Sequence, residues 1–355
     1  MKVLLVEPYY PRSEPPLGLM KLSTWHKARG ANVRFIRGTD PFRIILGDYN
    51  PDQIDITTPI FSWRTDEGIQ TMNFYLERFP DAHVRVGGVK AWDTPTVYQN
   101  DRVELVRGNI PEVDECQPDY SLFPDLDRSV IYTVKGCPVG CGFCRVWRES
   151  GKTPIIIKNW RSHIDYTKDR LIIQDDNIIA AGLEHLKDVV SVIKEHNLSV
   201  DFNSGFEVNQ FSEEHAQILQ GLKIRPVRTA FDELKEETEA LYTISLIRKY
   251  ITDNTNNILC YVLFNYLETP KECLYRCMKV IEAGALPYVM NFVPNNWIKG
   301  DLQHGEPFIS EKYGWTLEKV KKFRRFWGRF WIWRSVLKNK GTISENDIYE
   351  YGSPL

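Results

Sequence analysis

The chain has 355 residues, of which 43% are hydrophobic and 26% charged, a composition typical of a globular protein with room for two domains. Its formal net charge of −2 gives no general attraction to nucleic acid or to anionic membrane. No apolar run reaches the ~18–20 residues that a membrane span needs. The opening run MKVLLVEP is too short for a signal peptide, so we expect a cytoplasmic protein with reduced cysteines.

Residues 1–110 alternate short β-rich runs with helical patterns over Leu17–Arg29 and Thr65–Arg78. This alternation predicts an α/β fold, a Rossmann-like parallel sheet with helices on both faces. Ligands of such sheets bind beyond the carboxyl ends of the strands, where the loop Glu7–Gly18 and the pair Gly87-Gly88 fall. The predicted strands are Lys2–Val6, Val33–Ile36, Ile54–Thr58 and His83–Val86.

A linker over residues 111–128, which carries three prolines, leads to a second series of units over residues 129–300. Six apolar runs alternate there with helical patterns, the last of which begins with Thr269 as N-cap and Pro270 at its first position. Such a series predicts a partial (β/α)6 barrel, with a C-terminal helical extension over residues 301–355. The predicted strands are Val130–Val134, Leu171–Gln174, Val200–Asn203, Val227–Phe231, Ile258–Phe264 and Tyr288–Phe292. The predicted helices are Leu183–Glu195, Glu213–Leu222, Glu236–Tyr250 and Lys271–Ala283.

The loop after the first of these strands reads KGCPVGCGFC and carries Cys137, Cys141 and Cys144. Thiolates hold iron–sulfur clusters, and three of them leave the fourth iron of a [4Fe–4S] cube open to a substrate or cofactor. The glycines of the loop permit backbone angles that other residues avoid, and Phe143 can shield a cluster from water.

Other interpretations of the cysteines are weaker. A structural zinc site needs four ligands, and Cys116 and His163 are the nearest further candidates in sequence. Seven cysteines are too few and odd in number for a disulfide framework. Three of them are expected to be buried apolar residues rather than ligands: Cys260, Cys273 and Cys277.

The Cys-x3-Cys-x2-Cys spacing, with Phe143 beside the last cysteine and a barrel strand before the loop, resembles the signature of radical S-adenosylmethionine (SAM) enzymes. In that family the open iron chelates SAM, and one electron from the cluster cleaves SAM to methionine and a 5′-deoxyadenosyl radical. The resemblance implies a [4Fe–4S] cluster on Cys137, Cys141 and Cys144, SAM as cofactor, and a reductant such as flavodoxin or ferredoxin as partner.

Candidate SAM contacts follow the predicted barrel strands. The run Asp175-Asp176-Asn177 resembles the version of the family's amino-group-binding motif in the cobalamin-associated class, although Asp and Asn also cap helices. The family's Gly-x-Ile-x-Gly-x-x-Glu aligns with residues 261–268, where Tyr261 and Asn265 replace both glycines. The candidates are Phe143, Asp175, Asp176, Asn177, Glu207, Asp232 and Glu268.

Pro15-Pro16-Leu17-Gly18 and Gly87-Gly88 resemble the cobalamin-binding domain that precedes the catalytic domain in one radical SAM class. Gly18, Gly87 and Gly88 are therefore candidate cobalamin contacts. The Asp-x-His-x-x-Gly motif that supplies a cobalt ligand in other cobalamin proteins is absent, so a domain that keeps the fold without the corrinoid stays open. With cobalamin the resemblance implies methylation of an unactivated carbon; without it, oxidation, rearrangement or ring formation.

The segment Lys319–Lys340 is basic and interleaved with aromatic residues. This pattern suits a helix that packs its aromatic face on the barrel, which we favour over a surface that binds single-stranded nucleic acid. Two alternatives to the main hypothesis remain: a cobalamin-independent modifier of nucleotides or nucleic acid, and a non-enzymatic iron–sulfur protein. The sequence identifies neither the substrate nor the oligomeric state.

Overall fold

The computed structural model describes residues 1–11, 14–42, 45–297 and 308–353. The chain is a mixed α/β protein that divides into two compact units. The first unit contains Met1–Leu171 with Pro294–Asp301, and the second contains Ile172–Val293 with Leu302–Leu355. In the described ranges no helix combines the length and apolar character that crossing a membrane requires.

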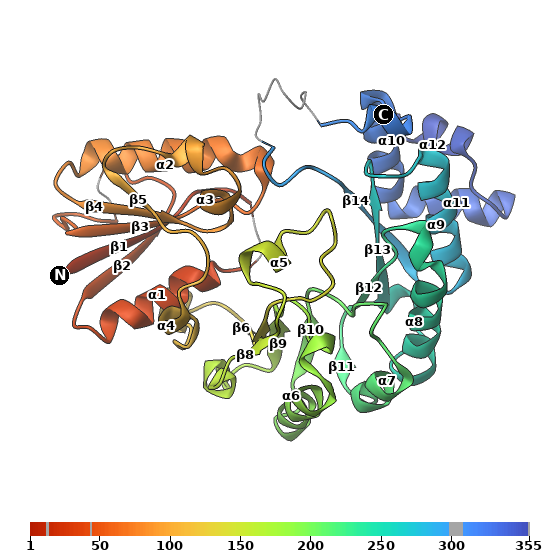
Figure 1. Cartoon of the computed structure of the whole chain (residues 1–355), viewed down its shortest axis with the longest axis horizontal. Helices are drawn as coiled ribbons and strands as arrows, with labels where there is room; N and C mark the ends of the chain where they lie inside the picture. The colour runs from red at the N-terminus through yellow and green to blue at the C-terminus, as the bar shows by residue number, and fades with distance from the viewer. Residues whose placement is uncertain (12–13, 43–44, 298–307, 354–355) are drawn as a thin grey trace. The chain divides into compact units, whose positions relative to one another are not determined.

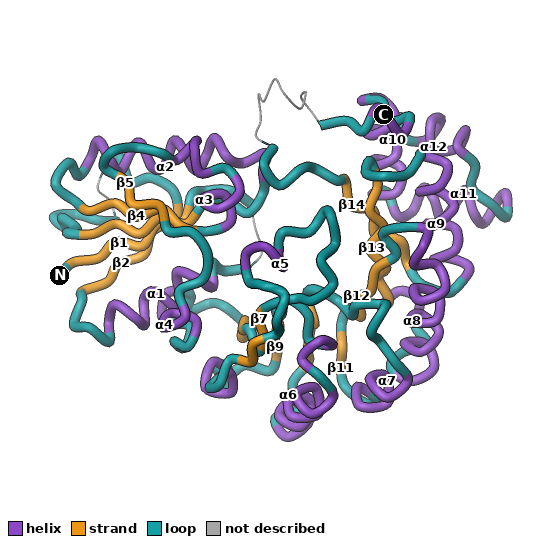
Figure 2. The backbone as a smooth tube through the Cα atoms, viewed as in Figure 1, coloured by secondary structure: helices purple, strands orange, loops and turns teal. Residues whose placement is uncertain are grey.

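The first unit is built on a five-stranded parallel sheet with the strand order β2-β1-β3-β4-β5 (Figures 1 and 2). Alternate residues of β1 face opposite sides, so that Leu4 and Val6 pack in the cluster beneath α2 while Val3 and Leu5 pack with α1. All four predicted strands are present, and the additional β5 has three residues, too few to give a pattern. The elements are β1 (Lys2–Glu7), α1 (Leu17–Lys27), β2 (Asn32–Arg37), β3 (Gln53–Thr57), η1 (Ser62–Arg64), α2 (Thr65–Arg78), β4 (His83–Gly87), α3 (Val89–Asp93), η2 (Pro95–Tyr98), β5 (Val103–Leu105), α4 (Pro111–Asp114) and η3 (Tyr120–Leu122).

The cysteine run lies in a hairpin of the first unit rather than directly after a barrel strand. The expected strand Val130–Val134 is interrupted, because β6 ends at Ile131 and the short β7 pairs antiparallel with β8. The prediction of one continuous strand was therefore wrong at its carboxyl end. The elements are β6 (Arg128–Ile131), β7 (Val134–Lys135), α5 (Val146–Glu149), β8 (Ile155–Ile156) and η4 (Trp160–His163).

Parallel strands and covering helices also make up the second unit, but they do not form one continuous sheet. One sheet has the order β11-β10-β9-β6, with the boundary between the units inside β9, and another has the order β12-β13-β14. A single bridge, Phe206 to Thr229, links them. The ladder breaks after β11, where Pro226 has no N–H to donate. The elements are β9 (Arg170–Ile173), η5 (Ile179–Ala181), α6 (Leu183–Glu195), β10 (Ser199–Phe202), α7 (Glu213–Leu219), β11 (Lys223–Ile224), β12 (Val227–Ala230), η6 (Leu234–Glu236), α8 (Glu237–Tyr250), η7 (Thr255–Asn257), β13 (Ile258–Phe264), α9 (Pro270–Glu282) and β14 (Leu286–Asn291).

The basic, aromatic segment forms two helices whose aromatic side chains are largely buried, as expected for packing. Phe323 of α10 contacts Phe264 of β13 with ring centroids 5.0 Å apart, and Phe326 and Trp327 are also buried. Phe330 and Trp331 of α11 are the exceptions, at 39% and 70% exposed. The elements are η8 (Glu311–Tyr313), α10 (Leu317–Gly328), α11 (Phe330–Lys340) and α12 (Glu345–Tyr351).

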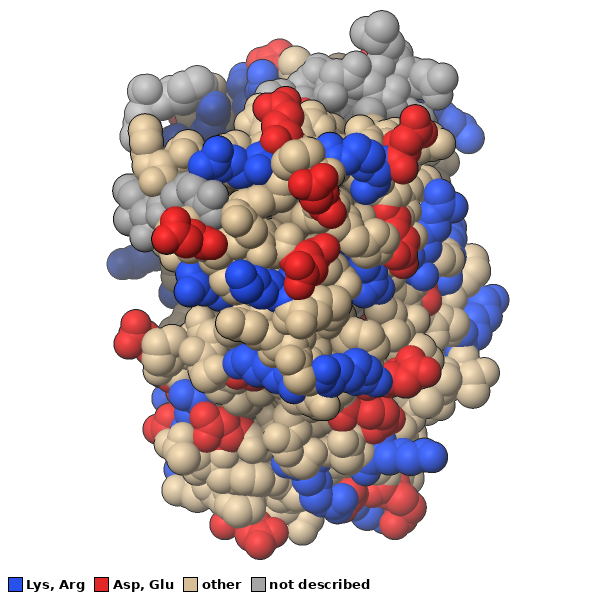
Figure 3. Space-filling view, turned by 90° about the vertical axis from the view of Figure 1, so that its left-hand side faces the viewer, with Lys and Arg blue, Asp and Glu red and all other residues tan. Residues whose placement is uncertain are grey.

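Charged side chains of both signs are interspersed on the face that Figure 3 presents, with no extended region of one sign.

Candidate functional site

Backbone geometry fixes the hairpin that carries the three cysteines. Gly136 has φ +95°, and a Cβ at this position would lie 2.3 Å from the carbonyl oxygen of Thr153. Cys137 N donates to the Gly151 carbonyl (3.1 Å), and Cys144 N donates to the Cys141 carbonyl (3.1 Å). Only glycine can bring the first cysteine this close to the returning strand.

The three cysteines and Phe143 are all half-buried, and none of the chain's seven cysteines forms a disulfide. Trp147, one turn further along, donates its indole N–H to the Cys141 carbonyl (3.0 Å) and so covers one side of the loop. The three thiols are therefore accessible, close in sequence and held on one glycine-rich loop. This donor set fits a cluster that takes thiolates on separate irons.

Within the described part of the chain, no three His, Cys, Asp or Glu side chains converge on a point that could hold a single metal ion.

In the first unit, the strand order changes direction between β1 and β3, because the connections from these neighbouring strands leave toward opposite faces. In open α/β sheets, ligands commonly bind beyond the carboxyl ends of the strands at such a switch point. Gly18 lies in the first turn of α1, is exposed, and would place a Cβ with no atom within 4 Å. Gly88 has φ +97°, and its Cβ would crowd the Thr57 and Thr58 hydroxyls at 3.0 and 2.9 Å. Gly88 therefore has a structural reason to be glycine, whereas Gly18 leaves open surface at the sheet edge.

Gly87 is the last residue of β4, and a Cβ there would make only an ordinary contact with Val106 at 3.6 Å.

The sequence did not single out the aromatic residues that border this edge. Phe61 and Trp63 stack with centroids 4.8 Å apart, and Trp63 is half exposed.

The remaining candidates lie in the second unit, after parallel strands. Asp175 and Asn177 follow β9 and are buried, and Asp176 between them is half-buried. Asn177 Oδ1 accepts a hydrogen bond from Ala180 N (3.1 Å) and so caps the short helix η5. Asn177 thus has the capping role that its residue type favours.

Glu207 has an unmet hydrogen-bonding requirement. Its Oε1 accepts from Asn209 N (3.0 Å) and from Asn209 Nδ2 (2.6 Å). Its Oε2 is buried and has no hydrogen-bond partner among the residues that the structure describes. Leaving a carboxylate oxygen buried without a donor is costly, so Glu207 can accept a hydrogen bond from a ligand hydroxyl or ammonium.

Asp232 and Glu268 are both held by the backbone around β12 and β13. Asp232 Oδ1 accepts from Leu263 N (2.9 Å), and burial together with nearby Glu236 raises the pKa of Asp232 to about 7. Glu268 Oε1 accepts from Leu234 N (2.6 Å), and its Oε2 accepts from Arg276 Nε (2.7 Å). Both oxygens of Glu268 therefore have protein partners, whereas Asp232 is a carboxyl group that can exchange a proton near neutral pH.

Asn265 shows how the chain accommodates the loss of glycine from the expected motif. Asn265 has φ +62°, the left-handed conformation that asparagine tolerates better than most residues. Its buried amide donates to Asn291 Oδ1 (3.1 Å) and accepts from Ser310 N (2.8 Å). The backbone turn after β13 is retained, while the side chain joins it to β14 and to the segment before α10.

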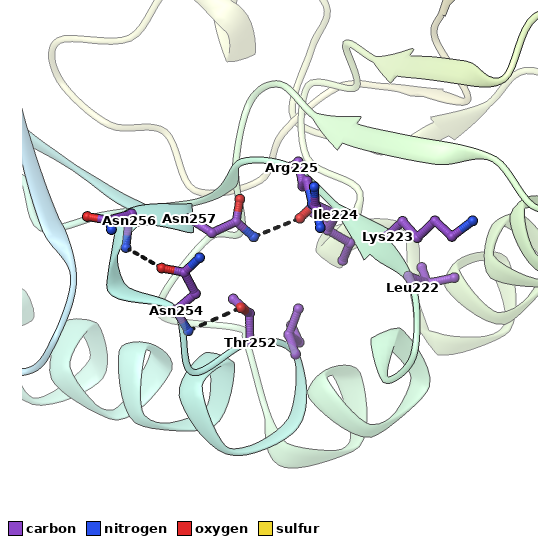
Figure 4. Close-up of a pocket in the computed structure, with 9 residues that line it drawn as sticks. Leu222, Lys223, Ile224, Arg225, Thr252, Asn254, Asn256 and Asn257 are labelled. Carbon is purple, nitrogen blue, oxygen red and sulfur yellow. Dashed lines mark hydrogen bonds between the residues drawn. The ribbon is translucent and has the colours of Figure 1, made fainter.

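One pocket in the described residues, of about 380 Å³, lies away from these candidates. Figure 4 shows it at the amino-terminal ends of β12 and β13, where Asn257 Nδ2 donates to the Ile224 carbonyl (2.9 Å) and Asn254 Oδ1 accepts from Asn256 N (3.0 Å). It lies at the end of the strands opposite to the candidate site. Its lining residues are Leu222, Lys223, Ile224, Arg225, Ile251, Thr252, Asn254, Asn256 and Asn257.

Comparisons with known proteins give only distant similarities. No protein-family model matches the chain, and no curated protein matches it. The cobalamin-dependent S-adenosylmethionine radical enzyme OxsB with aqua-cobalamin bound is 14% identical, with a TM-score of 0.47 over 82% of this chain and 49% of that chain. Apo, selenomethionine-labelled OxsB gives 13% identity and a TM-score of 0.44 over the same shares. The chain spans about half the length of OxsB, and at these values the similarity assigns neither an activity nor a ligand to it.

Proposed function

We propose that the protein is a radical SAM enzyme that binds a [4Fe–4S] cluster through Cys137, Cys141 and Cys144. The observation that carries the proposal is the cysteine hairpin. Three accessible thiols, none of them in a disulfide, lie on one loop that Gly136 allows to close against the returning strand. The proposal includes a Rossmann-like, cobalamin-binding-like domain over residues 1–110 and a partial radical SAM barrel over residues 129–300.

When bound, such a cluster supplies the electron that cleaves SAM and so gives access to C–H bonds that acid–base catalysis cannot activate. The side chains around the loop have simpler tasks. Phe143 and Trp147 limit the access of water to the cysteines, and the Trp147 indole fixes the Cys141 carbonyl. A reductant such as flavodoxin or ferredoxin would deliver the electron.

For SAM, the second unit offers carboxylates at the carboxyl ends of its strands. Glu207 Oε2 is the strongest candidate, because it is buried and lacks a donor from the protein. Asp175 and Asp176 suit the ammonium group through charge-assisted hydrogen bonds. Asp232 is suited to holding a proton, because burial raises the pKa of its carboxyl group to about 7.

In the first unit, a corrinoid is the proposed ligand of the crevice at β1 and β3. Gly18 supports this because its missing side chain leaves open surface there. If the corrinoid binds, methylation of an unactivated carbon is the reaction we propose. Gly88 gives no support for a corrinoid, because contact with the Thr57 and Thr58 hydroxyls already explains why this position is glycine.

Anaerobic reconstitution with iron and sulfide in the presence of hydroxocobalamin tests the proposal. After desalting, iron content and the visible spectrum report cluster and corrinoid, and dithionite with SAM then tests for 5′-deoxyadenosine. Ser variants of Cys137, Cys141 and Cys144 should lose the cluster. Cys116→Ser, which removes an equally half-buried thiol outside the loop, should keep it.

Each outcome selects one function. Retained corrinoid with 5′-deoxyadenosine supports cobalamin-dependent chemistry, and 5′-deoxyadenosine without corrinoid leaves the radical SAM proposal intact but removes cobalamin from it. A cluster that never cleaves SAM would make the chain an iron–sulfur binding or electron-transfer protein. Glu207→Gln should weaken SAM binding by about tenfold, the effect of losing one charge-assisted hydrogen bond, without lowering the iron content.

A further inference from the structure

Both ends of the cysteine run are attached to side chains of the first 115 residues, within the same compact unit. Before the run, Lys135 donates to Asn109 Oδ1 (3.0 Å) and to Asp114 Oδ1 (2.7 Å). Asn109 also donates through Nδ2 to Ser150 Oγ (3.4 Å), which follows α5. One asparagine thus contacts both sides of the hairpin that carries the cysteines.

After the run, Arg145 is the residue next to Cys144, and its Nη1 lies 3.3 Å from Asp93 Oδ2. The Asp93 side chain is 5% exposed, and the Arg145 side chain is 27% exposed. Arg145 Nε also lies 3.5 Å from Glu149 Oε2 on α5. The contact between Asp93 and Arg145 joins residues that are far apart in sequence, so Asp93 holds the end of the cysteine loop from outside the hairpin.

Asp93 occupies the centre of a buried charge cluster. Lys90 Nζ lies 3.7 Å from Asp93 Oδ2, donates to the Asn295 carbonyl (2.7 Å), and is 1% exposed. Lys90 N donates to Thr58 Oγ1 (2.9 Å), which attaches the helix to the end of β3. Asp93 therefore lies between one cation on its own helix and one beside a cysteine.

The helix that presents Asp93 is α3, and it begins directly after Gly88 at the carboxyl edge of the first sheet. A displacement of this turn would be transmitted through Asp93 to Arg145. The same acid that neutralises Lys90 thus connects the ligand edge of the sheet with the residue next to Cys144.

We propose that Asp93 is a positioning residue for the cluster: through Arg145 it fixes the backbone at Cys144 and couples this cysteine to the Gly87-Gly88 turn. This inference rests on the proposed function, since it concerns the third cluster ligand. Asp93 touches neither the cluster nor the substrate in this scheme. It acts by holding Arg145.

Two single variants and their double test the pair. Asp93→Asn preserves the size of the side chain and removes its charge, and Arg145→Gln breaks the same contact without disturbing Lys90. In the metal-free protein, each single variant should raise hydrogen exchange of the Cys144–Glu149 amides about fivefold, the effect of losing a partly buried ion pair. The double variant should add little, because both changes remove one interaction.

In the reconstituted protein, Asp93→Asn leaves the charge of Arg145 unbalanced beside the cysteine. A redox titration followed by electron paramagnetic resonance should therefore give a more positive midpoint potential, whereas Arg145→Gln should give a more negative one. The control is Asp127→Asn in the same unit. Its side chain is 55% exposed and pairs with Arg170 and Arg128, so the variant should change neither quantity.

Exchange and potential at wild-type values in both Asp93→Asn and Arg145→Gln would overturn the inference while the proposed function stands. A wild-type protein that takes up no cluster would instead refute the proposed function. Fully additive increases in hydrogen exchange in the double variant would show that Asp93 and Arg145 act independently, which also contradicts the inference.

Discussion

Arg276 and Glu268 form a buried ion pair that holds together the ends of two neighbouring strands. Arg276 Nε donates to Glu268 Oε2 (2.7 Å), while its Nη1 donates to the Phe231 carbonyl (2.5 Å) and its Nη2 to the Leu263 carbonyl (2.6 Å). The Arg276 side chain is 1% exposed. A single guanidinium therefore satisfies backbone groups at the carboxyl ends of β12 and β13.

Replacing Arg276 should be among the most destabilising single changes. Arg276→Met leaves the Glu268 carboxylate buried without its partner, which typically costs about 3–5 kcal/mol. Urea unfolding should show a lower midpoint with an unchanged slope. Lys279→Met on the same helix, which removes an ion pair with exposed Glu282, should change stability by less than about 0.5 kcal/mol. Equal effects of the two variants would contradict this account.

Asp232 should make stability depend on pH between about 4 and 7. Burial raises the folded-state pKa of Asp232 to about 7, from 3.8, so the folded chain binds more protons than the unfolded chain in this window. Its contribution is present at low pH and is lost as pH rises through the folded pKa. Asp232→Asn retains an acceptor for Leu263 N and removes the ionisation. Between pH 4 and pH 8, the free energy of unfolding of the variant should rise relative to that of wild type by up to about 4 kcal/mol, and a constant difference would refute the prediction.

Gly136 and Gly18 should respond in opposite ways to alanine. Gly136→Ala forces a Cβ to 2.3 Å from the Thr153 carbonyl oxygen at φ +95°, so the hairpin must distort and iron uptake should fall. Gly18→Ala adds a methyl group to open space in the first turn of α1 and should stabilise the protein by roughly 0.5–1 kcal/mol. Iron analysis and thermal unfolding measure the two effects. Loss of corrinoid from a stable Gly18→Ala variant would identify Gly18 as a place of close ligand approach.

The loss of stability on replacing an aromatic residue of the C-terminal helices should depend on how deeply its side chain is buried rather than on whether it is Phe or Trp. Phe326 is fully buried, and Phe326→Ala should cost about 3–5 kcal/mol. Trp331 is 70% exposed, and Trp331→Ala should change stability by less than about 0.5 kcal/mol. Chemical denaturation measures both. A steep, salt-dependent affinity for single-stranded RNA that Trp331→Ala abolishes would instead favour the nucleic-acid hypothesis over packing.

The sequence predicts four of the five strands of the first sheet and most of those in the second unit, because each of these has a clear apolar pattern. The prediction fails where contacts with residues distant in sequence determine the local structure. At Thr133, where the expected strand is interrupted, the carbonyl accepts a hydrogen bond from Ile157 N (2.9 Å). The sequence also places Glu268 correctly after β13, but the partner of Glu268 is on α9 and no local pattern reveals it. The sequence does not predict the contact between Asp93 and Arg145 either, since nothing in the local pattern distinguishes these residues from ordinary charged surface residues.

The hairpin that carries the cysteines is closed at its base by two residue pairs, Val134–Ile156 and Lys135–Ile155. So short a ladder contributes little cooperative stability, so this segment can open while the buried sheets on either side of it in sequence stay folded. Under the proposed function, insertion of a cluster then need not be coupled to synthesis of the chain. A folded, metal-free protein would present its thiols to an iron donor and would take up a new cluster after oxygen has destroyed the first, without passing through the unfolded state.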